Sequence, residues 1–167
     1  NATGVESIEA SLSVPGIANL PQVFEKAWNI SDGSVVSGFP RRVDGFPFYS
    51  SPTTASVDGR PGRAAIEGND TYWVHAFHAD GTEAAGFPKY TGQWMSFSST
   101  VWDPDMNGHV HFVDPTREGF LYDWATSGRT ADNNSWWTYR HDERRTGDYS
   151  VDSRRPAALS DLRIVND

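Results

Sequence analysis

The best candidate for a metal site in this chain is a short acidic segment in which oxygen ligands alternate and a glycine follows. The ligands are Asp103, Asp105 and Asn107. Alternating oxygens followed by glycine allow a loop to wrap around a hard cation such as Ca²⁺. Asp, Asn and Gly also favour tight turns without any metal. The sequence therefore predicts either a calcium site or a plain turn at this segment.

Two pairs of histidines could be taken for transition-metal ligands. His109 and His111 alternate along a predicted strand and so project to one face. A zinc or copper site needs at least a third protein ligand, which the sequence does not show. His75 and His78 lack a third ligand too, and they do not share a strand face. We interpret these histidines as surface or core residues.

One charged cluster near the end of the chain has the residue types of a catalytic site. It consists of Arg140, His141 and Asp142, followed by Arg144 and Arg145. A Ser-His-Asp hydrolase of the common α/β type would also show a Gly-x-Ser-x-Gly elbow, and the chain has none. We therefore expect no catalytic residues and no enzymatic role.

Three tryptophans are candidates for stacking against a sugar ring. They are Trp94, Trp136 and Trp137. Large aromatic side chains also dominate the packing of hydrophobic cores. The sequence leaves open whether these residues form a ligand platform or part of the core.

Four segments match the Asn-x-Ser/Thr acceptor for N-glycosylation, which begins in each case at the asparagine. These asparagines are Asn1, Asn29, Asn69 and Asn133. Turns in β proteins select Asn, Ser and Thr for conformational reasons, so such matches also arise by chance. Both interpretations stay open.

The composition indicates an all-β protein. Aromatic residues reach 13% among 37% hydrophobic residues, with 15 Gly and 10 Pro, which favours short strands joined by tight turns over long helices. The net charge is −8, and no run of Lys or Arg exceeds two residues, so we expect no nucleic-acid partner. Cysteine is absent, which excludes disulfides and thiolate metal sites. No apolar stretch approaches the ~18 residues of a membrane helix, and we expect no membrane span.

A repeat of about 48 residues organises the chain. The segment 32–40, Asp-Gly followed by Gly-Phe-Pro, returns at 80–88. An aromatic strand precedes each copy, at 23–28 and 72–77, and a degenerate third copy of that strand at 120–124 leads to a predicted turn at Gly128. Repeats of 40–50 residues built from short strands are typical of propeller blades.

The repeat predicts how the chain folds and what it lacks. The Asp-Gly pair predicts a two-residue hairpin turn, and Gly-Phe-Pro predicts the end of strand pairing at a sheet edge. We expect an all-β, propeller-like array of four-stranded antiparallel blades. The chain has room for about two and a half to three blades, fewer than a closed propeller needs. Another chain, or self-association, would have to complete the array.

The segment 137–149 resembles the closing segment, W-P-x-F-R-H-D-x-x-x-T-G-x-Y, of bacterial secreted FG-GAP/VCBS-type propellers. Those proteins also have the Gly-Phe-Pro and Ser-Ser-Pro blade motifs found here at 32–40, 80–88 and 50–52. The resemblance covers about residues 22–150. It implies a secreted or cell-surface protein without catalytic residues in the propeller.

The same resemblance bears on two of the candidate sites. Family members use D-x-D-x-D/N-G-x-x-D loops to bind Ca²⁺, but His111 stands here at the last carboxylate position and Asp114 lies three residues further on. Apart from Ca²⁺ at this loop, we expect no cofactor. The resemblance also implies that Arg140, His141 and Asp142 tie the last strand to the first through charge-assisted hydrogen bonds.

We divide the chain into an N-terminal extension or first strand (1–20), propeller-like blades (21–150) and a C-terminal linker or tail (151–167). Its start without Met or a signal peptide suggests a processed or excised segment, or else a cloned domain. We expect a non-catalytic structural or assembly subunit that pairs with another chain or with copies of itself. A carbohydrate-binding or adhesion module and a quinoprotein-type propeller enzyme are the alternatives.

Overall fold

The computed structural model describes residues 3–11, 21–43, 45–47, 50–132, 136–142 and 144–148. The described residues form ten β-strands and one short 3₁₀ turn (Thr130–Asp132), which confirms the all-β prediction. No helix in these residues is long and apolar enough to cross a membrane. The strands are β1 (Thr3–Ser11), β2 (Pro21–Asn29), β3 (Arg41–Val43), β4 (Thr53–Ala55), β5 (Ala64–Gly68), β6 (Trp73–His78), β7 (Lys89–Tyr90), β8 (Thr100–Trp102), β9 (His109–Pro115) and β10 (Leu121–Arg129).

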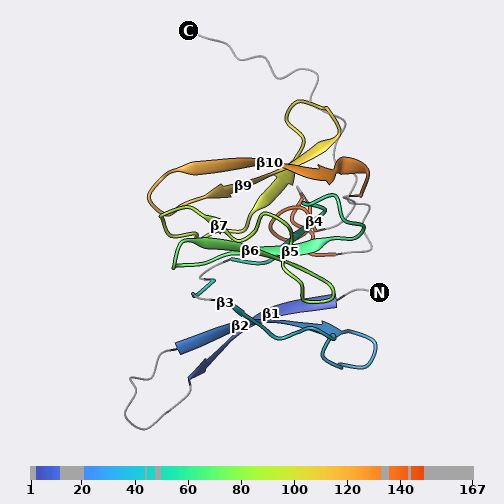
Figure 1. Ribbon diagram of the computed structural model, residues 1–167, viewed down its shortest axis with the longest axis vertical. Helices are drawn as coiled ribbons and strands as arrows, with labels where there is room; N and C mark the ends of the chain where they lie inside the picture. The colour runs from blue at the N-terminus through green and yellow to red at the C-terminus, as the bar shows by residue number, and fades with distance from the viewer. Residues whose placement is uncertain are drawn as a thin grey trace.

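The strands form three antiparallel sheets. We call them the first sheet (order β1-β2-β3), the middle sheet (β4-β5-β6-β7) and the last sheet (β10-β9-β8). Figure 1 shows them as three layers, with the middle sheet between the other two. Neighbouring strands in each sheet follow one another in the chain, so short hairpin connections are sufficient.

Apolar side chains fill both spaces between the sheets. The larger cluster lies between the middle and last sheets and includes Ile66, Met95 and Phe112, all fully buried. A smaller cluster, which includes Val23 and Phe77, lies between the first and middle sheets. All five residues of β5 are buried, because β5 belongs to the middle sheet and both of its faces are covered. β9 alternates between buried and half-buried residues, because only its inner face is covered.

The sequence repeat is also a structural repeat. After β2, the Val36 N–H donates to the Ala27 carbonyl at 2.9 Å; after β6, the Ala84 N–H donates to the Ala76 carbonyl at 2.8 Å. Both Phe-Pro peptide bonds that follow are cis. The Ser-Ser segments also lie side by side, since the Ser51 N–H donates to Ser98 Oγ at 2.8 Å. The two copies therefore fold alike.

The predicted two-residue hairpin turn at each Asp-Gly pair is wrong. The loop after β6 has three residues, 79–81, and the loop after β2 has four, 30–33. Gly81 closes the shorter loop with φ 76°, the left-handed conformation that such a loop needs at its end. Asp80 caps the loop by accepting the Thr82 N–H at 3.0 Å. The Asp-Gly pair thus ends a longer loop instead of forming the whole turn.

The turn predicted at Gly128 is also wrong, because β10 continues through this residue to Arg129, with a shift in its register against β9 between Ala125 and Arg129. A Cβ at Gly128 would overlap the carbonyl group of Ser56, in the loop after β4. The glycine therefore allows β10 to approach that loop closely. From the sequence alone, a glycine that allows two backbone segments to approach closely cannot be distinguished from a glycine that forms a turn.

Candidate functional site

The acidic segment proposed for calcium forms the loop between β8 and β9. The Gly108 N–H donates to Asp103 Oδ2 at 3.0 Å, and the His109 N–H donates to Asn107 Oδ1 at 2.7 Å. The Asn107 amide in turn donates to Asp105 at 2.6 Å. These bonds are those of a self-capped turn. In the described ranges no group of three or more acidic or histidine residues is placed to hold a metal, so calcium binding stays a prediction.

Asp58, in the loop after β4, links that loop to the middle sheet through several hydrogen bonds. Its Oδ2 atom lies 2.9 Å from Nε2 of His78 on β6 and also accepts the Ala85 N–H at 3.0 Å. Burial alone would raise the pKa of Asp58, but the hydrogen bonds from His78 and from two backbone N–H groups lower it below its ordinary value. This pair ties the loop after β4 to β6 and to the turn that follows it. Local sequence indicates only an Asp-Gly turn at Asp58, because its pairing with His78 joins positions 20 residues apart.

A buried carboxylate lies in the space between the middle and last sheets. Asp114 on β9 is fully buried and accepts a hydrogen bond from Ser99 Oγ at 2.8 Å. Burial raises its pKa to about 8, although the bond from Ser99 opposes this shift. Gly68 on β5 lies nearby, where its missing side chain leaves room for Met95; a Cβ there would lie 3.6 Å from Asp114 Oδ2, an ordinary contact distance. Near neutral pH this group mostly retains its proton.

A second group of carboxylates lies between the first and middle sheets; we call it the acidic interface cluster. It consists of Glu25 on β2, Glu67 on β5 and Glu83 in the turn after β6. Glu25 is fully buried, and its two oxygens have no hydrogen-bond partner in the described part of the chain. Burial raises its pKa well above the ordinary value, and the charges of the other two carboxylates raise it further. Glu83 bonds to His75 Nδ1 at 2.8 Å.

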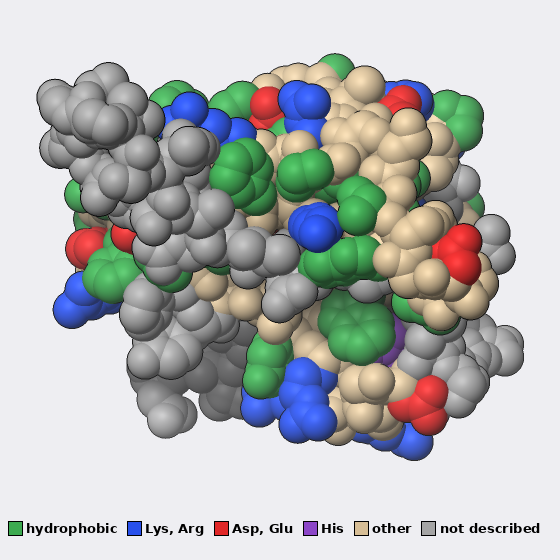
Figure 2. Space-filling view, turned by 90° about the horizontal axis from the view of Figure 1, so that it is seen from below, with side chains coloured by type: hydrophobic (Ala, Val, Ile, Leu, Met, Phe, Trp, Pro, Cys, Tyr) green, Lys and Arg blue, Asp and Glu red, His purple; other side chains and the backbone are tan. Residues whose placement is uncertain are grey.

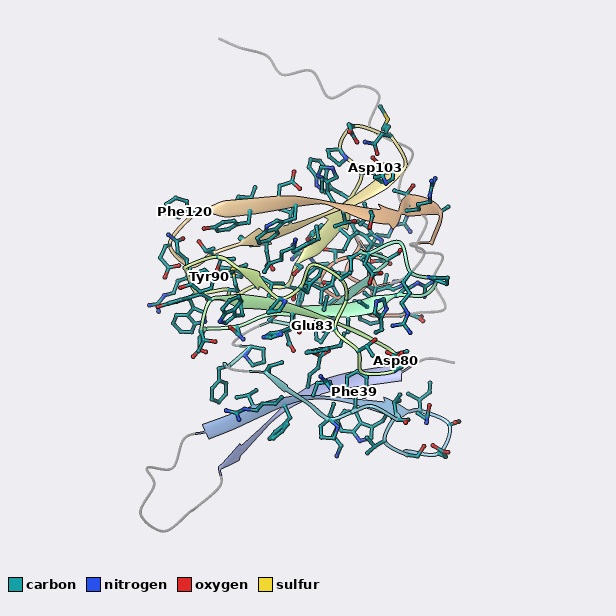
Figure 3. The ribbon with its side chains drawn as sticks, viewed as in Figure 1. Phe39, Asp80, Glu83, Tyr90, Asp103 and Phe120 are labelled. Atoms are coloured by element: carbon teal, nitrogen blue, oxygen red, sulfur yellow. The ribbon has the colours of Figure 1, made fainter. Side chains whose placement is uncertain are left out.

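Figure 3 shows that these candidate sites are far apart. Asp103 lies in a loop at the far side of the last sheet, whereas Glu83 lies at the face of the middle sheet that is turned towards the first sheet. The structure therefore places the predicted calcium loop and the acidic interface cluster in separate regions. The sequence reasoning missed Glu25 and Glu67 and named Asp114 only as a carboxylate near the calcium motif, because a carboxylate on a strand is usually solvent-exposed.

The three tryptophans proposed as stacking platforms are all half-buried. The Arg117 guanidinium lies over the Trp94 ring at 4.6 Å, and the edge of Trp136 meets His141 at 5.1 Å between ring centres. Trp137 packs against the larger core cluster. The tryptophan that sequence reasoning overlooked is Trp102 on β8, which is exposed. Sugar stacking stays a prediction.

The segment expected to close the array joins the middle and last sheets. The Trp136 carbonyl accepts the Thr54 N–H from β4 at 2.8 Å, and the Trp137 carbonyl accepts the Val101 N–H from β8 at 2.8 Å. Asp142 accepts two hydrogen bonds from Thr146 in its own segment. Backbone bonds to β4 and β8 therefore hold this segment against the two sheets. The charge-assisted link to the first strand stays a prediction.

The remaining candidates have ordinary structural surroundings. His111 Nδ1 lies 2.9 Å from Asp123 Oδ1 on the outer face of the last sheet. Asn29 donates to Ser34 Oγ at 2.9 Å. Asn69 is buried with its amide nitrogen enclosed, which leaves no room for a glycan on the folded chain. Asn1 and Asn133 lie outside the described residues.

Comparisons with protein families, with curated proteins and with solved structures found no match for this chain. The resemblance to FG-GAP/VCBS-type propellers therefore stays a prediction from sequence motifs. The candidate sites are buried carboxylates between stacked sheets: Asp114 between the middle and last sheets, and Glu25 between the first and middle sheets.

Proposed function

We propose that this chain is a non-catalytic structural module of a secreted or cell-surface β-propeller protein, in which further sheets cover its two end faces. Another polypeptide or another copy of the chain would supply those sheets. Two features support the proposal: the stacking of repeated antiparallel sheets, and the motifs that resemble FG-GAP/VCBS-type propellers. A repeat sheet of this kind buries its hydrophobic faces only by stacking on neighbours.

The observation that carries the proposal is the exposure of apolar side chains at both ends of the stack. On the last sheet Leu121 is 69% exposed and Trp102 is 44% exposed. At the first sheet Ile30 and Val35 are exposed beside β2. Figure 2 views the molecule from the side of the first sheet and shows hydrophobic side chains next to Lys and Arg side chains. Exposed apolar side chains that gather on one face are typical of an interaction site.

Light scattering on the purified chain, combined with binding of the dye ANS, tests the proposal. We expect either association above the 18.5 kDa of one chain or a monomer that binds ANS through its open sheet faces. A monomer that unfolds cooperatively and binds no ANS would contradict the proposed function, because its end faces would then need no cover.

A further inference from the structure

The contact between the first and middle sheets shows how one repeat covers the next. The loop at Asp80 and Gly81 touches Gly38, which belongs to the Gly-Phe-Pro turn of the preceding copy. Phe77 on β6 packs against Val23 and Val43 of the first sheet. In Figure 3 Asp80 and Phe39 lie together between these two sheets. The loop at Gly81 in one repeat thus contacts the glycine turn at Gly38 of the preceding repeat. The aromatic residue Phe77 packs against the sheet of that preceding repeat.

Trp28 stands on β2 where Phe77 stands on β6. Trp28 forms an antiparallel bridge with Val35, and Phe77 forms the same bridge with Glu83. The third aromatic of the series, Trp124, stacks on Phe112 of its own sheet at 4.6 Å between ring centres, and it packs against the core cluster between the last and middle sheets. Two of the three equivalent aromatics therefore pack on a preceding sheet. The described residues contain no sheet that covers Trp28.

The glycine contact is also open at the first sheet. Gly33 corresponds to Gly81 and has nearly the same conformation, with φ 72° against 76°. The site of a Cβ at Gly81 is filled by the backbone of Gly38, whereas the site at Gly33 has no atom within 4 Å in the described structure. Val35 beside it is 43% exposed. In the described residues no preceding sheet makes either contact, and the Trp28 ring is contacted instead by Lys26 of its own strand, with Nζ 5.1 Å from the ring centre.

We propose that the outer face of β1–β3 docks a further antiparallel sheet of the same repeat type. This sheet brings its Gly-Phe-Pro turn onto Gly33 and its apolar residues, equivalent to Val23 and Val43, onto Trp28. The inference rests on the proposed function and names the partner of one of its two faces. The last sheet of a second copy does not fit, because no Gly-Phe-Pro turn follows β10. That sheet also presents Asp123 at the position where the middle sheet has Ala76.

The chain itself supplies a probe for this interaction. We would place a second copy of residues 64–108 directly before residue 1, which adds the equivalents of β5 to β8. The added equivalents of β5, β6 and β7 would form the covering sheet. The added equivalent of β8 would pair with β1, as β4 pairs with β5. Because the chain has no cysteine, Val35→Cys gives a single thiol on the face to be covered.

We expect the Val35→Cys thiol to react with a disulfide reagent about tenfold or more slowly in the extended chain, because burial limits the reaction to transient openings. The matched control is Ala125→Cys on the exposed face of β10, which should react equally fast in both chains. A second control introduces Phe87→Asp in the added copy only. It charges the anchor of the added Gly-Phe-Pro turn, and the reaction should become fast again.

An equal reaction rate at Val35→Cys in the folded extended chain would overturn the inference. Protection in the unextended chain that grows with protein concentration would also overturn it, because a second copy would then be the partner. Both results leave the proposed function standing, since that proposal is contradicted only by a cooperatively folded monomer without ANS binding.

Discussion

At the scale of single residues, the most informative group is the Asp114 carboxyl. Its pKa of about 8 in the folded chain lies above the 3.8 of a free aspartate, so the folded state binds the proton more tightly than the unfolded state. The free energy of unfolding should therefore fall as the pH rises from about 4 to about 8, by at most ~1.4 kcal/mol per pH unit for one group. Above pH 8 this contribution stays constant.

Asp114→Asn should flatten this decline, since asparagine does not ionise and can still bond to Ser99. Urea unfolding at pH 5, 7 and 9 measures the effect. Glu118→Gln, in the exposed turn between β9 and β10, is the control and should leave the slope unchanged. An Asp114→Asn chain whose stability declines as steeply as that of the parent chain would contradict the assignment.

The contribution of the Asp58–His78 pair to stability can be measured by comparing Asp58 with the matching residue of the next repeat. Asp58→Ala leaves a buried imidazole and the Ala85 N–H without their acceptor, which we expect to cost about 1–3 kcal/mol or more of unfolding free energy. Asp105 occupies the matching place one repeat later, but it is exposed. Asp105→Ala should change stability by no more than about 0.5 kcal/mol. Equal thermal denaturation of the two variants would refute a structural role for the pair.

At the scale of elements, the strands were predictable and their connections were not. The aromatic strands at 23–28, 72–77 and 120–124 all fall on β2, β6 and β10, because residue type and repeat spacing determine such strands locally. The predicted loop lengths were wrong, since an Asp-Gly pair can form a whole turn or end a longer loop. The burial of the carboxylates was not predicted either, because it depends on which sheet lies opposite.

Gly128 provides the test at this scale. Gly128→Ala places a Cβ on the Ser56 carbonyl group, so β10 or the loop after β4 must shift, at a cost of about 1–3 kcal/mol. Ala125→Val, on the exposed face of the same strand, should be close to neutral or slightly stabilising, because valine favours strands. Chemical denaturation of both variants measures the difference. A neutral Gly128→Ala would show that the approach of β10 to this loop is not tight.

At the scale of the whole molecule, the two spaces between the sheets differ in strength. The core between the middle and last sheets is large and apolar, whereas the contact of the first sheet has a small apolar cluster and contains the acidic interface cluster. Deprotonating buried Glu25 beside two other carboxylates is unfavourable, so rising pH should weaken the first sheet's contact most. We expect the first sheet to open before the rest of the stack.

Hydrogen exchange with mass spectrometry at pH 7 to 9 tests this order, because it reports the opening of each strand separately. Amides of β2 should exchange faster than those of β5 and β9, by a margin that grows with pH beyond the intrinsic increase. Glu25→Leu should restore protection to β2, since an apolar side chain replaces a buried carboxylate at little or no cost. Lys26→Leu, on the opposite face of the same strand, serves as the control. If β2 is protected as well as β5 at pH 9, the first sheet is not the weaker part, and Glu25 does not govern its docking.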